Sequence, residues 1–296
     1  MRSGPKIGIC TDSSSQLPRA LRDRYDIEVV PLTVSVNGHE YLEDVDLDAD
    51  EFWAQFAGGR RPEVSTAEPS PGQFALAYES LIERGATEIL SVHVAGAISA
   101  TLRAARLAAH NAAVPVRLVD SGTASFGVTC CVWAAALAAE NGATLDEAAV
   151  IAESVAATLG NVFVVGAPDL ARAGGRARVP VEELSAGQLP VMTLESGDAR
   201  VIDTVTEVRQ AADVMVRYIE SRGTELLVAV GLADPHGAPV SEAVFEALNT
   251  SSHVREVIRY RIGPSVGAHV GPGTAGAWVF PAPSTAGSTA VAADVP

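Results

Sequence analysis

Three segments of the sequence combine hydroxyl, imidazole and glycine residues in a way that suits the binding of an anion. They are residues 66–72, 98–101 and 262–274. Thr66 and Ser99 each offer a hydroxyl donor, and His269 offers a ring N–H. A carboxylate that leaves water needs such donors, because an unpaired buried charge is very costly. Residues of these types can therefore donate to an anion such as a carboxylate.

Ordinary structural roles could also explain each of these residues. Ser99 lies at the start of a predicted helix, where free backbone N–H groups favour an anion, but serine is also a common N-cap residue. Thr66 could shape the turn before Pro69, and a single histidine in a glycine-rich loop is usually exposed to solvent. Considered one by one, the residues leave both interpretations open.

The sequence resembles a serine hydrolase at one motif only. Residues 263–267 match the GxSxG pattern, in which a helix must follow the serine. The Gly-Pro-Gly run at 271–273 is expected to block such a helix. An esterase that uses Ser265 or Ser99 with His269 is therefore kept only as the enzyme alternative.

Patterns for nucleotide and metal binding are also incomplete. Residues 271–276 match GxGxxG, but a strand-like stretch follows them in place of the helix that a dinucleotide site requires. The acidic residues 44–48 resemble the start of a calcium loop, yet Ala49 replaces the required glycine and Gln55 the final glutamate. The histidines show no HxxxH or HExxH spacing, so we expect no metal site and no cofactor.

The bulk composition favours a protein with a large apolar core and no affinity for polyanions. Hydrophobic residues make up 48% of the 296 residues, and the net charge of −15 argues against nucleic acid and anionic membranes. Cys10, Cys130 and Cys131 form no CxxC motif and suit apolar packing. The chain shows neither a signal peptide nor an apolar run of roughly 18 residues, so we expect a cytoplasmic protein.

Short apolar stretches alternate with segments of helical periodicity along the chain, a pattern that predicts parallel sheets with right-handed crossovers. Asp48 and Glu51 form the pattern of a capping box before one helix. The predicted strands are 7–10, 27–36, 88–93, 116–120, 162–165, 191–194, 226–231, 254–262 and 277–280. The predicted helices are 18–25, one from 49 onward, 72–84, 99–113, 126–141, 145–159, 208–222 and 241–248.

These elements indicate two α/β domains, of which the first has a parallel sheet with flanking helices. We place the first domain at residues 1–160 and the second at residues 161–283. After residue 283 the chain is rich in Ser, Thr, Ala and Gly, and we predict a disordered tail over residues 284–296.

Several motifs, taken in order along the chain, resemble the DegV family. The most specific is the segment 262–274 that contains His269. The others are Thr11–Ser14, Val119–Ser121 with Ser125 and Gly127, Gly174–Arg176, and Arg209 before a helix of the second domain. The resemblance extends over about residues 6–280.

This resemblance implies two α/β domains with a long-chain fatty acid buried between or within them. It implies that the carboxylate is held by Thr66, Ser99 and His269. Further residues of the ligand site would be Ala100, Thr101 and Gly271. The fatty acid is a ligand, and no cofactor is implied.

Two of the family's motifs are altered here. The usual Leu-Ser-Gly-Thr reads Ile-Ser-Ala-Thr at 98–101, so Ala100 adds a methyl group where the family lets the backbone approach the ligand. The usual Thr-Ser-Gln-Pro-Ser reads Thr-Ala-Glu-Pro-Ser at 66–70, and Glu68 brings a carboxylate near the expected anion site. These changes bear on ligand identity and affinity more than on the fold.

The resemblance also implies a binding protein that acts with a separate enzyme. An ATP-dependent fatty acid kinase would phosphorylate the carboxylate that this protein presents. Arg176 and Arg172 lie in an arginine-rich loop and are candidates for contact with that kinase, although a solvated loop is the simpler interpretation. A lipid sensor or storage protein without a kinase partner is a further alternative.

Overall fold

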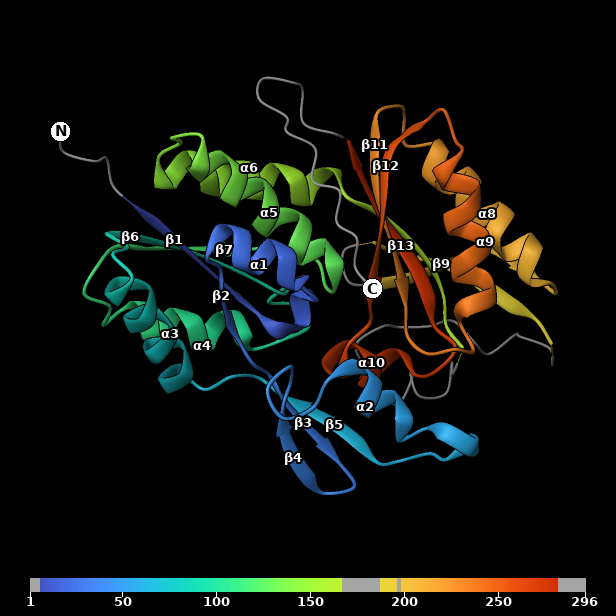
Figure 1. Ribbon diagram of the computed structural model, residues 1–296, viewed down its shortest axis with the longest axis horizontal. Helices are drawn as coiled ribbons and strands as arrows, with labels where there is room; N and C mark the ends of the chain where they lie inside the picture. The colour runs from blue at the N-terminus through green and yellow to red at the C-terminus, as the bar shows by residue number, and fades with distance from the viewer. Residues whose placement is uncertain (1–5, 167–186, 196–197, 282–296) are drawn as a thin grey trace. The chain divides into compact units, whose positions relative to one another are not determined.

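The computed structural model describes residues 6–166, 187–195 and 198–281, which belong to two compact units (Figure 1). The first unit comprises the chain up to Gln55, residues 59–157 and the segment Gly263–Val266. The second comprises Phe56–Gly58, residues 158–262 and residues from 267 onward. Local sequence patterns contain no signal for the return of Gly263–Val266 to the first unit.

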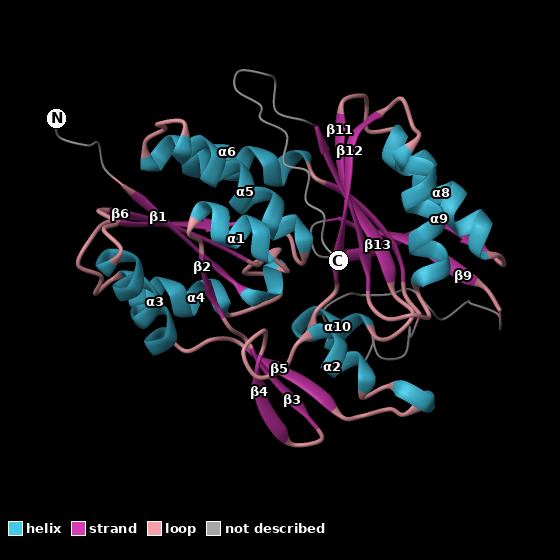
Figure 2. Ribbon diagram, in the orientation of Figure 1, coloured by secondary structure: helices cyan, strands magenta, loops and turns pink. Residues whose placement is uncertain are grey.

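A parallel sheet forms the centre of the first unit, as predicted (Figure 2). Its strand order is β2-β1-β6-β7, and each neighbouring pair is parallel. The strands are β1 (Ile7–Asp12), β2 (Glu28–Val30), β6 (Glu88–His93) and β7 (Val116–Asp120). Nearly all of β1 and β6 is buried, as expected for strands covered by helices on both faces.

Helices cover both faces of this sheet (Figure 1). One face is covered by α3 (Pro71–Glu83) and α4 (Thr101–Ala109), and the other by α1 (Arg19–Tyr25), α5 (Phe126–Glu140) and α6 (Leu145–Thr158). Beneath α3 and α4, strand residues Cys10 and Ile89 belong to one buried apolar cluster with Phe74, Tyr78 and Ala105. The first seven residues of α5 are all buried, including Cys130 and Cys131. The adjacent cysteines are thus core residues, as expected.

The single strand predicted at residues 27–36 is wrong. β2 ends at Val30, and a second strand, β3 (Thr33–Val36), belongs to a different sheet. Pro31 lies between them, and proline cannot donate the backbone hydrogen bond that a continuous central strand requires.

β3 is the centre of a small antiparallel sheet that was not predicted from the sequence. Its neighbours are β4 (His39–Leu42) and β5 (Val64–Ala67). Asn37 and Gly38 join β3 to β4 with φ angles of 51° and 81°. A two-residue turn with both φ angles positive is the type I′ turn that Asn-Gly favours, so this dipeptide was a readable hairpin signal.

The helix starts follow their capping residues closely. The capping box predicted before α2 (Ala49–Ala54) is confirmed, because Asp48 Oδ1 accepts the Glu51 N–H at 2.8 Å and Glu51 Oε2 accepts the Asp48 N–H at 3.1 Å. The helix predicted over residues 99–113 is shorter, since α4 begins at Thr101 and ends at Ala109.

A six-stranded mixed sheet forms the second unit. Its order is β10-β9-β8-β13-β11-β12, and only β11 and β12 are parallel neighbours. The strands are β8 (Gly160–Val164), β9 (Leu189–Glu195), β10 (Asp198–Val205), β11 (Leu226–Leu232), β12 (Val254–Arg261) and β13 (Ala275–Pro281). Helices α8 (Val208–Glu220) and α9 (Ala238–Asn249) pack on it through a common apolar core. The prediction of a second α/β domain is confirmed, although β10 was missed.

The chain forms a short helix before the Gly-Pro-Gly run, where we expected none. This helix, α10 (Pro264–Val270), begins with proline, whose fixed φ suits the first turn. It ends at Gly271, which has a φ of 74° and donates its N–H to Gly267 O at 2.8 Å. The glycine therefore stops the helix after seven residues and does not prevent it.

Candidate functional site

The carboxyl ends of β1 and β6 meet at the place where the parallel sheet reverses its order. β1 connects through α1 to β2 on one side, whereas β6 connects through α4 to β7 on the other. Open α/β sheets bind their ligands at such switch points. The strands end here in Asp12, His93 and Asp120, so three titratable residues lie at the same edge of the sheet.

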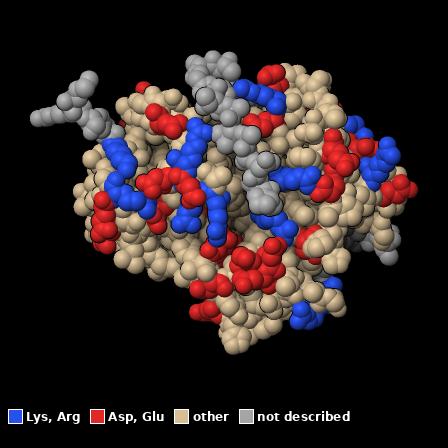
Figure 3. Space-filling view, viewed as in Figure 1, with Lys and Arg blue, Asp and Glu red and all other residues tan. Residues whose placement is uncertain are grey.

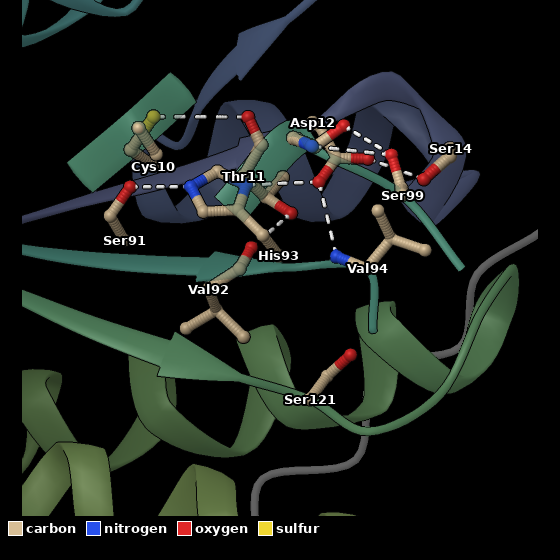
Figure 4. Close-up of polar contacts among 12 residues, drawn as sticks. Cys10, Thr11, Asp12, Ser14, Ser91, Val92, His93, Val94, Ser99 and Ser121 are labelled. Atoms are coloured by element: carbon tan, nitrogen blue, oxygen red, sulfur yellow. Dashed lines mark hydrogen bonds and ion pairs between the residues drawn. The ribbon is translucent and has the colours of Figure 1, made fainter. Parts of the chain in front are cut away.

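A chain of buried hydrogen bonds crosses this switch point (Figure 4). Asp12 Oδ2 lies 2.9 Å from His93 Nδ1, and His93 Nε2 lies 2.6 Å from Ser91 Oγ. Ser91 Oγ also lies 3.0 Å from the Tyr78 hydroxyl. A neutral His93 that donates to Asp12 accepts from Ser91, which then accepts from Tyr78. No local sequence pattern indicates this chain of hydrogen bonds, because Asp12 and His93 lie 81 residues apart.

The order Ser91–His93–Asp12 is that of a catalytic triad, but these residues are sealed from solvent. Each has an exposed fraction of 0%. A nucleophile must reach the reacting carbon of its substrate, and the Ser91 hydroxyl is enclosed between His93 and Tyr78. The arrangement therefore connects β1, β6 and α3 and is not an open hydrolase site.

Asp12 and its neighbours hold the loop that leads to Ser99. Asp12 Oδ2 accepts the Val94 N–H at 3.2 Å, and Thr123 O accepts the Ala95 N–H at 2.8 Å. Both carboxylate oxygens of Asp120 lie 3.2 Å from the Gly96 nitrogen. Three successive N–H groups after β6 thus have fixed acceptors, which restricts the path of the chain toward Ser99.

Ser99 lies one residue before the formal N-cap of α4 and is half-buried. Its Oγ lies 2.8 Å from Thr101 Oγ1 and accepts the Thr101 N–H at 3.3 Å. The N-cap residue Ala100 has a φ of −83° and makes no side-chain cap, so its methyl group causes no backbone strain. Ser99 and the fully buried Thr101 therefore form a hydroxyl pair at the start of α4.

Thr66 and His269 lie on other elements. Thr66 is a half-buried residue of β5, paired with Val34 of β3, and so it is not a turn residue. Glu68 is exposed just beyond the strand. His269 is half-buried in the last turn of α10 and belongs to the second unit, whereas Ser99 and Thr66 belong to the first.

Gly271 and the glycines after it have backbone roles. Gly273 donates its N–H to Asp234 Oδ1 at 2.6 Å, and a Cβ on Gly166 would lie only 2.3 Å from Pro272 O. Strand β13 begins at Ala275, two residues after the Gly-Pro-Gly run. The strand predicted over residues 277–280, on which the argument against a dinucleotide motif rested, is confirmed as part of β13.

Ser265 is too buried to act as the nucleophile of a hydrolase. A nucleophile elbow exposes its serine on a sharp turn between a strand and a helix. Ser265 follows the end of β12 by four residues and is the second residue of α10, but it is only 4% exposed. Its backbone N–H donates to Glu43 Oε1 at 2.8 Å, so the start of α10 is tied to a buried carboxylate.

Glu43 is a buried carboxylate that connects Ser13, after β1, to Ser265 at the start of α10. It is 1% exposed, and its Oε2 accepts the Ser13 hydroxyl at 2.5 Å. Burial raises the pKa of Glu43 to about 7, and the hydrogen bonds from Ser13 and Ser265 partly oppose that rise. Ser13 Oγ in turn accepts the Leu32 N–H at 2.9 Å.

The described part of the chain contains no group of three or more His, Cys, Asp or Glu residues placed to hold a metal ion. Within the same residues, no helix is long and apolar enough to cross a membrane. Basic and acidic side chains are interleaved on the face shown in Figure 3, which carries no continuous basic stripe. Arg172, Arg176 and the tail at 284–296 lie outside the described residues.

Comparison with known proteins gives one consistent family. The model of the family described as "Uncharacterised protein, DegV family" matches residues 6–282. A DegV domain-containing protein of Streptomyces coelicolor is 36% identical over 283 residues, which cover 91% of this chain and 96% of that protein. Another from Mycobacterium tuberculosis is 29% identical over 281 residues, covering 92% and 96% of the two chains.

Solved structures agree with this assignment. A structure described as fatty acid binding of a DegV family protein from Thermus thermophilus has a TM-score of 0.85 at 26% identity and covers 94% of this chain and 100% of that one. A DegV lipid-binding protein from Thermotoga maritima has a TM-score of 0.81 at 25% identity, with 93% and 98% covered. The DegV protein of Bacillus subtilis, 22% identical with a TM-score of 0.82 and coverage of 94% and 100%, shares the fold.

Proposed function

The chain belongs to the DegV family, and we propose that it binds a long-chain fatty acid and presents the carboxylate to a separate ATP-dependent kinase. The observation that carries the binding role is the similarity over 94% of the chain to a fatty-acid-binding member at a TM-score of 0.85. The family model matches nearly the same residues. Delivery to a kinase is the finer part of the proposal and rests on the resemblance of the motifs.

Under this proposal the carboxylate is held by Thr66, Ser99 and His269. The hydroxyl pair of Ser99 and Thr101 supports it, because the Ser99 proton can turn from Thr101 to a ligand oxygen. Ala100 and Gly271 would line the site through their backbones. The methyl group of Ala100 would narrow the space for the ligand. It leaves the start of α4 intact, because the negative φ of Ala100 is unstrained.

The acyl chain would supply most of the affinity. Each buried methylene contributes roughly 0.8 kcal/mol, so a sixteen-carbon chain gains on the order of 10 kcal/mol before ordering costs. A chain in which 48% of residues are hydrophobic can line such a tunnel with Ala, Val and Leu. The polar end of the ligand then decides its orientation.

Sealed hydroxyls argue for a binding protein over a hydrolase. Ser91 is closed off behind Tyr78, and Ser265 is buried within α10. The esterase alternative predicts a burst of p-nitrophenol when the purified protein meets a short p-nitrophenyl ester. We expect no burst, and its appearance would replace the carrier proposal with a hydrolase.

Reconstitution tests delivery. Protein loaded with oleate, mixed with a fatty acid kinase and ATP, should give acyl-phosphate, whereas either protein alone should not. If the loaded protein binds oleate yet never supports acyl-phosphate formation, and captures no kinase in a pull-down, then it is a sensor or storage protein and the kinase half of the proposal is wrong.

A further inference from the structure

The last residue of β1 and the four residues after it, 12–16, are almost completely buried, and we call this segment the β1 loop. Four of its five residues make hydrogen bonds to segments far away in the sequence, and Ser14 donates to Asp12 within the loop. Their partners are Val94 and His93 for Asp12, Glu43 and Leu32 for Ser13, Asp12 itself for Ser14, Thr129 for Ser15 O, and Gly263 for Gln16. Two of these partners lie at the start of segments that carry proposed head-group residues.

The first such partner is Val94, which begins the loop toward Ser99. Asp12 accepts its N–H at 3.2 Å and is itself oriented by His93 and by the Ser14 hydroxyl (Figure 4). Ser99 follows five residues later and donates its own N–H to Ala95 O at 3.1 Å. Because Val94 and Ala95 are fixed, the start of the turn that ends in Ser99 is fixed as well.

The second partner is Gly263, directly before α10. Gln16 Oε1 accepts the Gly263 N–H at 2.6 Å, and the backbone of Gln16 is held at a φ of 59°. A Cβ on Gly263 would lie 3.2 Å from Gln16 Nε2 and 3.0 Å from Glu43 Oε1. The contact is therefore close enough to favour glycine at this position.

A second set of hydrogen bonds connects the β1 loop to α10, from Ser13 through Glu43 to Ser265. Ser13 donates to Glu43 Oε2 at 2.5 Å, and Ser265 donates its N–H to Glu43 Oε1 at 2.8 Å. The β1 loop thus holds the first turn of α10 by two routes. His269 lies on the same short helix, four residues after Ser265, so its position depends on how that first turn is held.

We propose that the β1 loop positions the fatty-acid head group without contacting it, Asp12 acting through Ser99 and Gln16 acting through His269. This inference rests on the proposed function. In it Asp12 and Gln16 are positioning residues, and the loop determines the geometry of donors that lie on two different segments of the chain.

Binding of oleate to substituted proteins tests the proposal. Asp12→Asn weakens the acceptor for Val94, and Gln16→Met removes the acceptor for Gly263 at nearly constant length. Each should bind oleate roughly ten-fold more weakly than the parent, as expected when a fixed hydrogen bond is lost. The matched control is Ser15→Ala in the same loop, whose Oγ has no hydrogen-bond partner among the described residues and whose loss should leave affinity unchanged.

Double substitutions separate positioning from general damage to the fold. Asp12→Asn should cause no further loss when Ser99→Ala is already present, and Gln16→Met none beyond His269→Ala. The crossed pair, Gln16→Met with Ser99→Ala, should show additive losses. Additive losses in every pair would overturn the proposal. If circular dichroism shows that Asp12→Asn does not fold, the Gln16→Met variants with His269→Ala and with Ser99→Ala still test the proposal.

Amide hydrogen exchange of the ligand-free protein makes the test independent of fatty-acid binding. The Val94 amide should exchange faster in Asp12→Asn, and the Gly263 amide faster in Gln16→Met, with Ser15→Ala matching the parent. Unchanged exchange at both amides overturns the positioning role. A parent protein that binds no oleate at all, with these exchange effects present, overturns the proposed function and leaves the loop contacts established.

Discussion

Glu43 shows at the scale of one residue how a buried charge limits the stability of this protein. Its carboxylate is 1% exposed, and burial raises its pKa from the ordinary 4.5 to about 7. Below pH 4.5 Glu43 is protonated whether the chain is folded or not. Between pH 4.5 and about 7 the carboxyl group ionises in the unfolded chain but stays largely protonated in the folded protein. The free energy of unfolding therefore falls as the pH rises to about 7.

We therefore predict that Glu43→Gln stabilises the protein above pH 7. The interval between 4.5 and about 7 corresponds to roughly 3 kcal/mol, and glutamine keeps an acceptor for the Ser265 N–H without the charge. Thermal unfolding at pH 8 and pH 5 measures this, with the advantage of the variant largest at pH 8. A variant less stable than the parent at pH 8 would show that Ser13 and Ser265 compensate fully for the buried charge.

Thr66, Ser99 and His269, the proposed head-group residues, should each contribute to the affinity for oleate. Ser99→Ala, Thr66→Val and His269→Ala should each weaken oleate binding by roughly 1.5–3 kcal/mol while leaving the fold intact, because each removes a donor to a charged group. Ser154→Ala on the exposed face of α6 is the control. If isothermal titration gives all three variants the affinity of the parent, the carboxylate is bound elsewhere.

The elements were predictable where the local pattern decides the structure. β6 has the predicted bounds, 88–93, because the apolar residues Ile89, Leu90 and Val92 form a short stretch between two segments of helical periodicity. The 27–36 strand was wrong because its apolar residues continue through Pro31, and only the sheet pairing shows that the chain changes sheets there. The Asp12–His93 pair joins strands 81 residues apart, so no local pattern could reveal it.

The hairpin that joins β3 to β4 depends on the positive φ angle of Gly38. Gly38→Ala should destabilise the protein by about 1 kcal/mol, because φ is 81° and only glycine adopts it without strain. No atom lies within 4 Å of the added methyl group, so strain is the only cost. Urea denaturation measures the change.

Gly72 in the first turn of α3 is the matched glycine. An added Cβ there would lie 3.7 Å from Ser70 Oγ, an ordinary contact, so Gly72→Ala should raise stability by about 0.5 kcal/mol. If both glycine variants changed stability in the same direction, the positive φ of Gly38 would not be what matters.

For the molecule as a whole, the sequence predicted two α/β domains and their family, whereas the hydrogen bonds that join the β1 loop to distant segments emerged only from the structure. Ser99 could be singled out because it precedes a helix and carries a hydroxyl. The β1 loop could not, because its role depends on partners such as Glu43 and Gly263 that are 30 to 247 residues away.

Delivery to a partner is also a property of the whole molecule. Arg172, Arg176 and Arg178 are close together in a chain with 21 basic and 36 acidic residues, and arginine is enriched at interface hot spots. We predict that Arg176→Ala binds oleate normally but loses most acyl-phosphate production with kinase and ATP. Equal loss of oleate binding would place Arg176 at the ligand instead, and unchanged phosphorylation would remove it from the kinase contact.

Native mass spectrometry of the protein purified from a bacterial host tests the central claim most directly. Carriage of a long-chain fatty acid predicts a mass increase equal to one fatty acid per chain, with the acid identified after extraction. It also predicts that protein stripped of lipid regains one equivalent from added oleate or palmitate. A protein that carries no lipid as purified, and takes up none from either acid, would contradict the account.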